Sequence, residues 1–489
     1  MKIRAFIALL LSLLVAVIGV SHDSFWIDEA FSAHYAVQPT LASWWHCLSG
    51  VGNGSDAQMP LYMFYLWAWE KLLGSSEWAL RAANIPWFLL AQAAFWIGLR
   101  RWPRLQFAAV ICAACDPFLW RYLDETRPYM MQYAGATIVL SCLAPFVSAT
   151  APVIRARWVL AFAAGLLILC GSSALGVPWA GAATLGLFCL TWRRASLAKG
   201  PALIAALAVA VLALGGLAAY IAWTLASGHK GAVGLGHRFA SLCFAAYEVL
   251  GFGGLGPSRV QVIDGNPRDF LPFLAPLTVL AVLFAGVIAI GLRGFRSFAD
   301  GRAMAAALLY VLIPIGMIVA LVYGADFHAV GRHFAPTAPA TVLLVAVALV
   351  AAWRDKAPWQ IGWTTAFLLL WLASSLEIRF DPRHLRDDYR DSAVIARAAL
   401  SSGKRVWWAA VDGTGAYYHV PLSPDSDGMK TARIIWRPLP QDLAVLPPPD
   451  VVIFSKPALF DTVGALSAYL QAHSYRQVKS LPAFTIWEK

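Results

Sequence analysis

Apolar runs of about twenty residues recur along the first three quarters of this 489-residue chain. A helix of that length crosses the ~30 Å hydrocarbon core of a bilayer. The first run is retained as a helix, because His22-Asp23-Ser24 offers no small-residue cleavage site for a signal peptidase. The pattern predicts about eleven transmembrane helices, over residues 3–20, 78–99, 105–122, 129–147, 158–173, 176–192, 201–226, 271–292, 303–323, 334–352 and 359–377.

Positive charge alternates between the connecting loops, which indicates how the chain is oriented. Basic residues cluster in one set of short loops, which the positive-inside rule places in the cytoplasm: Lys2, Arg4, Arg100, Arg101, Arg104, Arg155, Arg157, Arg193, Arg194, Lys199, Arg293, Arg296, Arg302, Arg354 and Lys356. The other set is longer and more acidic and is predicted to lie outside: residues 21–77, 123–128, 227–270 and 324–333. An odd number of spans places the C-terminal segment outside as well.

Composition agrees with a membrane protein. Hydrophobic residues make up 60% of the chain and charged residues only 13%, whereas soluble domains carry about a quarter charged residues. The net charge of +11 does not indicate a nucleic-acid partner, because the Lys and Arg residues lie in short loops between apolar runs rather than on one polar face. We therefore expect membrane lipids around the chain and no nucleic acid.

The composition changes near Asp381, which predicts two domains: a transmembrane domain over 1–380, with a long first outer loop at 21–77, and an outer α/β domain over 381–489. Alternation and helical periodicity predict helices at 390–400 and 463–472 and strands at 405–411, 434–437, 451–455 and up to Trp487. Asp412-Gly-Thr-Gly-Ala is predicted to be a structural turn, because it lacks the third glycine of a nucleotide-binding loop.

Three outer segments carry candidate chemistry. Asp28 and Glu29 follow the first span, where a carboxylate can act as a general base or simply favour a helix start. Asp116 falls inside a predicted span and is expected to be paired or to face a cavity, whereas Arg127, beside Pro128, can grip a phosphate or form a salt bridge with Glu125. A third segment, with Asp326, His328, Arg332 and His333, fits either a lipid-phosphate site or interfacial anchors.

The seven cysteines add little. Cys112 and Cys115 lie within one apolar run and are expected to be core residues. Cys47 and Cys243 both fall in outer segments, where a disulfide between them is one option.

Four motifs in order resemble the GT-C type lipid-linked-sugar glycosyltransferases, the superfamily of protein O-mannosyltransferases and of lipid A aminoarabinose transferases. The resemblance covers most of the membrane part. Its motifs are Asp28-Glu29; Pro60-Leu61-Tyr62 with Leu73-Gly-Ser-Ser-Glu-Trp-Ala-Leu-Arg81; Pro117-Phe118 … Tyr122 … Glu125-Thr-Arg-Pro-Tyr129; and Gly331-Arg-His-Phe-Ala-Pro336 … Pro339.

The resemblance implies a sugar donor carried on a polyprenyl phosphate such as undecaprenyl phosphate, with inverting transfer on the periplasmic face of a cell inner membrane. The acceptor is lipid A, O-antigen, a wall polymer or a protein. Asp28 and Glu29 are implied as the catalytic residues: Asp28 as the base or the acid that orients the acceptor, and Glu29 as its support or as a metal ligand. The implied phosphate-binding or framework residues are Arg81, Arg127 and Arg332, and the supporting residues are Asp124, Glu125, Tyr129, His328 and His333.

The chain departs from the family at Gln58, where His-Pro-Pro or Lys-Pro-Pro is common, so a phosphate contact at that position is in doubt. A divalent metal ion at Glu29 stays open, because the spacing of His22, Asp23, Asp28 and Glu29 matches no closed metal site.

Two other classes compete with an enzyme. A transporter or flippase for a lipid-linked substrate usually shows internal repeats and charged helices near the midplane, and we find no repeat. An inactive scaffold for envelope assembly would keep the same acids without using them.

Overall fold

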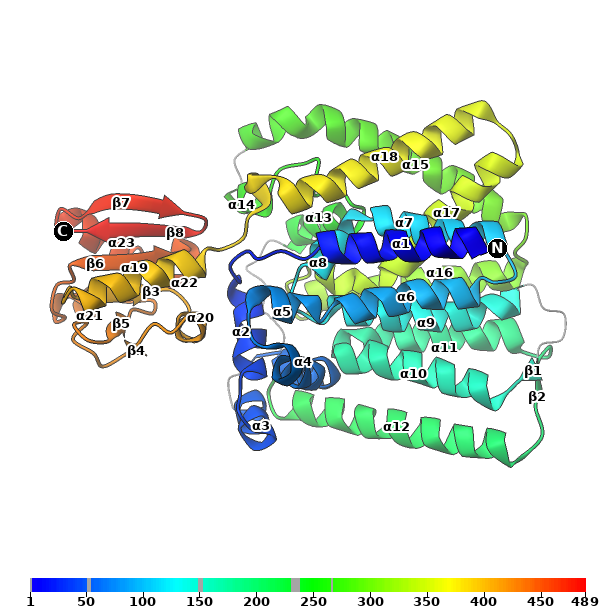
Figure 1. The fold of residues 1–489 in the computed structure, drawn as a ribbon, viewed down its shortest axis with the longest axis horizontal. Coiled ribbons are helices and arrows are strands. Elements are labelled where there is room, and N and C mark those ends of the chain that lie inside the picture. Colours follow the sequence, from blue (N-terminus) through cyan, green and yellow to red (C-terminus); the bar gives the residue numbers. More distant parts are fainter. Residues whose placement is uncertain (1, 51–53, 148–152, 230–237, 265–266) are drawn as a thin grey trace. The chain divides into compact units, whose positions relative to one another are not determined.

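The computed structural model describes residues 2–50, 54–147, 153–229, 238–264 and 267–489 (Figure 1). The chain divides into two compact units. A helical unit comprises Met1–Ser21, Ala42–Trp69 and Arg81–His384, and an α/β unit comprises His22–Leu41, Glu70–Leu80 and Leu385–Lys489. The predicted boundary at 380/381 lies close to Leu385, but the α/β unit also takes in two pieces of the predicted first outer loop.

The helical unit is built from helices whose first turn often holds a proline, which has no amide hydrogen to lose there. Its helices are α1 (Lys2–Ile18), α3 (Leu41–Ser49), α4 (Pro60–Leu73), α6 (Ile85–Gly98), α7 (Pro103–Cys115), α8 (Pro117–Leu123), α9 (Tyr129–Val147), α10 (Ala156–Ser172), α11 (Val177–Thr191), α12 (Pro201–Ala226), α13 (Arg238–Val249), α14 (Arg259–Asp264), α15 (Leu274–Arg296), α16 (Gly301–Gly324), α17 (Ala338–Arg354) and α18 (Pro358–Phe380). Helix α5 (Glu77–Ala82) lies mostly in the α/β unit, and α3 and α4 extend past the limits of the helical unit. Short 3-10 helices η1 (Asp56–Gln58), η2 (Ala174–Gly176), η3 (Pro267–Phe273), η4 (Gly331–Thr337) and η5 (Pro382–His384) and the strand pair β1 (Val153–Ile154) and β2 (Ser196–Leu197) lie between them.

Each of the eleven predicted spans contains a helix. Among the described residues, seven helical stretches are long and apolar enough to cross a membrane: Tyr129–Val147, Ala174–Thr191, Pro201–Ala226, Phe270–Arg296, Gly301–Gly324, Gly331–Arg354 and Pro358–Phe380. The other predicted spans are shorter or broken. The span 78–99 is divided at Asn84 into α5 and α6, and the span 105–122 at Asp116 into α7 and α8. The chain is a multi-pass membrane protein, and the count of eleven crossings stays a prediction.

Helix α9 lies in the core of the helical unit and packs against α6 and α10. Small residues allow the backbones to approach closely, as is usual between membrane helices. A Cβ on Gly135 would lie 2.6 Å from the backbone nitrogen of Leu169 on α10, and one on Gly98 would lie 2.5 Å from the Cβ of Ser141 on α9.

The α/β unit contains a six-stranded sheet in the order β4-β5-β3-β6-β8-β7. Strands β4 (Leu422–Ser423), β5 (Ala432–Ile434), β3 (Val406–Ala409) and β6 (Val451–Ser455) are parallel, and β8 (Phe484–Glu488) and β7 (Arg476–Leu481) are antiparallel. Its helices are α2 (Ile27–Ala36), α19 (Tyr389–Ser401), α20 (Asp412–Tyr417), α21 (Pro440–Ala444), α22 (Pro457–Phe460) and α23 (Ala465–Ala472). The predicted helices at 390–400 and 463–472 and the predicted strands are present, with the second strand at Ala432–Ile434 rather than 434–437.

The prediction of a glycine turn at Asp412 is wrong, because this segment forms helix α20. Gly415 is needed for packing rather than for a turn. A Cβ on Gly415 would lie 2.7 Å from the Leu422 side chain and 2.9 Å from the Trp408 ring. Periodicity alone could not distinguish a short glycine-containing helix from a turn.

We predict that Gly135→Ala destabilises the protein by about 1–3 kcal/mol, because the new methyl group collides with backbone atoms of α10 that cannot move aside. Gly181→Ala in α11 is the matched control, since a Cβ there meets no atom within 4 Å. Thermal unfolding in detergent should show a lower midpoint for the first variant alone. Equal midpoints would contradict the close α9–α10 contact.

Candidate functional site

Helix α2 in the α/β unit carries the two acids that the sequence singled out. The chain is extended at Trp26, and the Glu29 carboxylate accepts the Trp26 amide at 3.4 Å, which closes the N-terminus of the helix. Both acids lie in the first turn, where the helix dipole favours negative charge. Glu29 is fully buried, whereas Asp28 is partly accessible. The two neighbours therefore occupy different environments.

Glu29 forms an ion pair with Arg386, whose guanidinium lies 3.2 Å from its Oε2 atom. The Arg386 side chain is only 17% exposed, so both charges are largely removed from water. A buried carboxylate needs such a partner, and the ion pair holds the Glu29 side chain in place. Within the described ranges, no group of three or more His, Cys, Asp or Glu side chains is placed to hold a metal ion.

In the helical unit, Arg81 forms part of a buried network. Its Nη1 atom donates to the Ser21 hydroxyl at 3.1 Å, and its Nε atom lies 3.8 Å from Asp124 Oδ1. That carboxylate also accepts the Ser21 amide at 2.6 Å. Because Arg81 is fully buried, these contacts favour a framework role that joins the end of α1 to the end of α8.

Arg127 is also buried, at 5% exposed. Its Nη1 atom donates to Asp56 Oδ1 at 2.8 Å, and its Nη2 atom lies 3.7 Å from the Met59 sulfur. Gln58, in the same short helix η1, donates to the His229 carbonyl at 2.5 Å. The second predicted loop is thus tied to the segment that precedes Pro60.

Asn84 is a residue of this framework that sequence reasoning missed. Its fully buried side chain donates to the carbonyl oxygens of Tyr122, Leu123 and Glu125, the last at 2.6 Å. An amide is well suited to this role, because its N–H groups can satisfy carbonyls of the last helical turn that have no partner within the helix. The available signal was a lone asparagine inside a predicted apolar span.

Arg332 places the last of the four motifs next to the third, which contains Tyr129. In η4 its guanidinium carbon lies 6.0 Å from the centre of the Tyr129 ring, a cation–π geometry. The pKa of nearby His328 is lowered by burial and by the positive charges of Arg259 and Arg332. His333 accepts the Val330 amide at 3.3 Å and packs on Phe327, which makes it a support of the loop.

Glu248 on α13 holds the start of η4, and the sequence did not single it out. Its Oε2 atom accepts the Gly331 amide at 2.9 Å, and its Oε1 atom lies 3.5 Å from Arg121 Nε. Gly331 must be glycine for this approach, since a Cβ there would lie 2.5 Å from the Cβ of Glu248. Glu248 therefore connects α8, α13 and η4 through one buried carboxylate.

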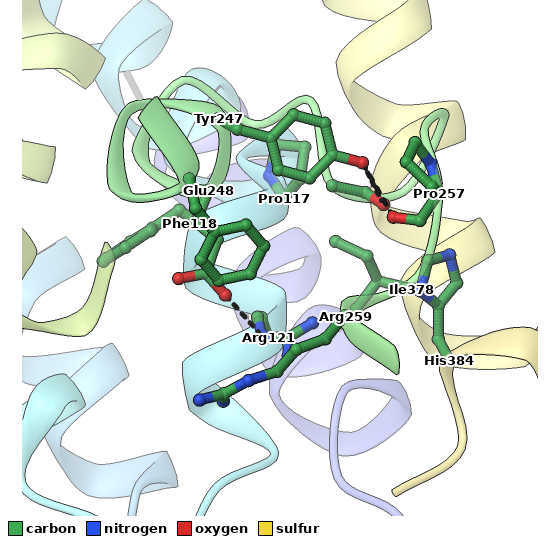
Figure 2. A pocket seen from close by; sticks show the side chains of 11 residues that line it. Pro117, Phe118, Arg121, Tyr247, Glu248, Pro257, Arg259, Ile378 and His384 are labelled. Carbon is green, nitrogen blue, oxygen red and sulfur yellow. Dashed lines mark hydrogen bonds and ion pairs between the residues drawn. The ribbon is translucent and has the colours of Figure 1, made fainter. Parts of the chain in front are cut away.

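A small pocket lies beside this carboxylate (Figure 2). Its polar lining is Arg121, Glu248, Arg259 and His384, with the Tyr247 hydroxyl turned to donate to the Pro257 carbonyl at 2.9 Å. The other lining residues are Pro117, Phe118, Phe244, Gly253 and Ile378. The lining holds two guanidiniums and one carboxylate, so it carries a surplus of positive charge beside an apolar wall.

Asp116 is buried at the junction of α7 and α8. Its carboxylate accepts the Phe118 amide at 2.9 Å and caps α8. Cys112 and Cys115 are buried core residues as expected, and the structure records all seven cysteines as thiols, which excludes the Cys47–Cys243 disulfide as an existing bond.

No protein-family model and no curated protein matches the sequence. Among solved structures, ArnT from Cupriavidus metallidurans bound to undecaprenyl phosphate matches with a TM-score of 0.52 at 13% identity, over 99% of this chain and 97% of that one. The chain has the ArnT fold. This confirms the predicted GT-C type architecture of many membrane helices with a C-terminal α/β domain.

Two further structures match at lower similarity. ArnT from the same organism in the apo state has a TM-score of 0.48 at 15% identity, with 99% and 97% coverage. Arabinofuranosyltransferase AftD from Mycobacteria has a TM-score of 0.45 at 14% identity, and the match covers all of this chain but 40% of AftD.

We predict that His384 makes this ArnT-like protein sensitive to acid. Burial, then the charges of Arg121 and Arg383, lowers the pKa of His384 to about 4, against the opposing effect of its contact with the Gly254 carbonyl. The unfolded chain takes up this proton near pH 6.5, so the stabilisation from neutral His384 is present above that pH and is lost as the pH falls toward 4.

His384→Gln retains a polar nitrogen that can donate to the carbonyl but does not titrate. Its unfolding midpoint should therefore fall less than that of wild type when the pH is lowered from 7 to 4.5. Parallel midpoint curves for the two proteins would show that His384 does not carry this effect.

Proposed function

We propose that the protein is a membrane glycosyltransferase that takes a sugar from a polyprenyl-phosphate donor and transfers it, with inversion, to an acceptor on the periplasmic face of a cell inner membrane. The donor sugar is a hexose or a pentose. The acceptor is lipid A, O-antigen, a wall polymer or a protein. The ArnT structure with undecaprenyl phosphate supports the donor class by analogy of fold.

The observation that carries this proposal is the pocket beside Glu248. A sugar on a polyprenyl phosphate joins a negatively charged phosphodiester to an apolar chain, and the pocket lining combines guanidiniums with an aromatic and aliphatic wall. A planar guanidinium suits phosphate oxygens because it offers two parallel N–H groups. We assign three arginines of this region to the donor phosphate: Arg121, Arg259 and Arg332. Arg81 and Arg127 are assigned to the framework around it.

The reaction needs little from the protein beyond charge and placement. Asp28, the accessible acid of α2, removes the proton from the acceptor hydroxyl or amine. The acceptor atom then bonds to the anomeric carbon as the bond from that carbon to the phosphate oxygen breaks. The electron pair stays on the polyprenyl phosphate, whose negative charge the guanidiniums neutralise.

The first test compares wild type with Asp28→Asn, using release of free polyprenyl phosphate from a panel of lipid-phosphate sugars and crude envelope extract as acceptor. Loss of the base should slow turnover of one donor by at least about a hundredfold. Asp23→Asn, in the same segment, is the matched control and should retain activity. Equal rates for wild type and Asp28→Asn would refute Asp28 as base, and an inert wild type would favour a transporter or a scaffold.

The second test addresses the pocket. Arg259→Gln removes a guanidinium that lines it and should raise the KM for the donor by about tenfold, since a charge-assisted contact with phosphate contributes about 1.5–3 kcal/mol. Arg268→Gln, an exposed arginine that does not line the pocket, is the control. Equal KM values for the two variants would place the phosphate elsewhere.

A further inference from the structure

The α/β unit has the topology of an open sheet with a switch point. From β3 the chain continues to β4 and β5 on one side of the sheet, and from β6 it continues to β7 and β8 on the other. The connections at the carboxyl ends of β3 and β6 therefore diverge. In open α/β sheets this position is where a ligand usually binds.

Here a segment of the same chain contacts that position. Helix α2 packs against α20, which begins at Asp412 just after β3, and Phe31 of α2 lies next to Gly413. Lys456, which follows β6, pairs with Asp387, and the adjacent Arg386 pairs with Glu29 of α2. The carboxyl edge of the sheet thus meets the helix that carries Asp28.

A second set of contacts fixes the segment just before α2. These contacts come from the C-terminal part of the unit. The Tyr418 hydroxyl accepts the Phe25 amide at 2.9 Å and donates to Glu77 at 3.2 Å. The amide of Arg390 donates to the Ser24 hydroxyl at 3.0 Å. Phe25 is fully buried against the Tyr417 ring, with 5.4 Å between the ring centres.

We propose that the C-terminal α/β domain is a positioning element for Asp28, which holds helix α2 at its topological switch point through the Glu29–Arg386 ion pair and the Tyr418 hydroxyl. This inference rests on the proposed function, in which Asp28 is the base. Arg386 and Tyr418 are positioning residues: they touch the helix and not the substrate. A small displacement of a reacting group is costly, up to about a hundredfold for 1 Å.

The test measures kcat and KM for the donor in four variants. Arg386→Ala should lower kcat by about tenfold or more, with KM within about twofold of wild type, because the base moves while the donor contacts stay. Arg386→Lys should recover part of kcat, since it keeps the charge. Arg397→Ala, which removes an exposed arginine from α19, is the matched control and should keep the wild-type kcat.

Tyr418→Phe is the fourth variant and covers the case in which Arg386→Ala does not fold, because it removes one hydroxyl from a ring that stays packed. Its kcat should fall, and the acidic limb of its pH profile should shift as the surroundings of Asp28 change. A folded Arg386→Ala with the kcat of Arg397→Ala would overturn the proposal. So would an unfolded Arg386→Ala combined with a wild-type kcat in Tyr418→Phe.

Hydrogen exchange separates this proposal from the proposed function. If wild type turns over no donor, the function fails, but the positioning can still be measured. Amides of residues 27–36 should then exchange faster in Arg386→Ala than in Arg397→Ala, while those of the strand Val451–Ser455 stay protected in both. Unchanged exchange in 27–36 would refute the positioning itself.

Discussion

A charge that is removed from water must be paired, and in this protein the pairs join segments that lie far apart in the chain. Glu29 and Arg386 are separated by most of the sequence, and their ion pair ties the first predicted outer loop to the C-terminal domain. Glu248 does the same for α8, α13 and η4. Because breaking one partner of a buried pair leaves an uncompensated charge, these contacts constrain the loops more strictly than apolar packing does.

The apolar helices have a different task. Lipid tails are as apolar as leucine, so the helices pack through small residues and shape, as at Gly135 beside Leu169. This scaffold leaves the ends of helices as the place for polar groups. Asp116 caps the start of α8, Asn84 donates to three carbonyls at and just after the end of that helix, and Glu248 binds the start of η4. The polar network is therefore built from helix ends that need hydrogen-bond partners.

Within each unit, residues that look alike in sequence have different roles. Glu29 forms a buried ion pair with Arg386, whereas the neighbouring Asp28 is partly accessible to solvent. Arg81 and Arg127 are buried among side-chain partners, whereas Arg121 and Arg259 line a pocket. The extent of burial thus distinguishes the framework residues from the candidate binding residues. A sequence motif does not show how buried its residues are.

The sequence by itself determined the apolar helices, the compositional change near residue 381 and the main strands after it, because these follow from local periodicity and chain length. It also indicated Asp28, Glu29 and Arg332 through short motifs. Only the tertiary structure decided that α2 belongs to the α/β unit, that Arg386 is the partner of Glu29 and that Glu248 lies between Arg121 and Gly331. The physical reason is that burial and ion pairing depend on which distant segments of the chain come into contact. A local pattern of residues does not specify those contacts.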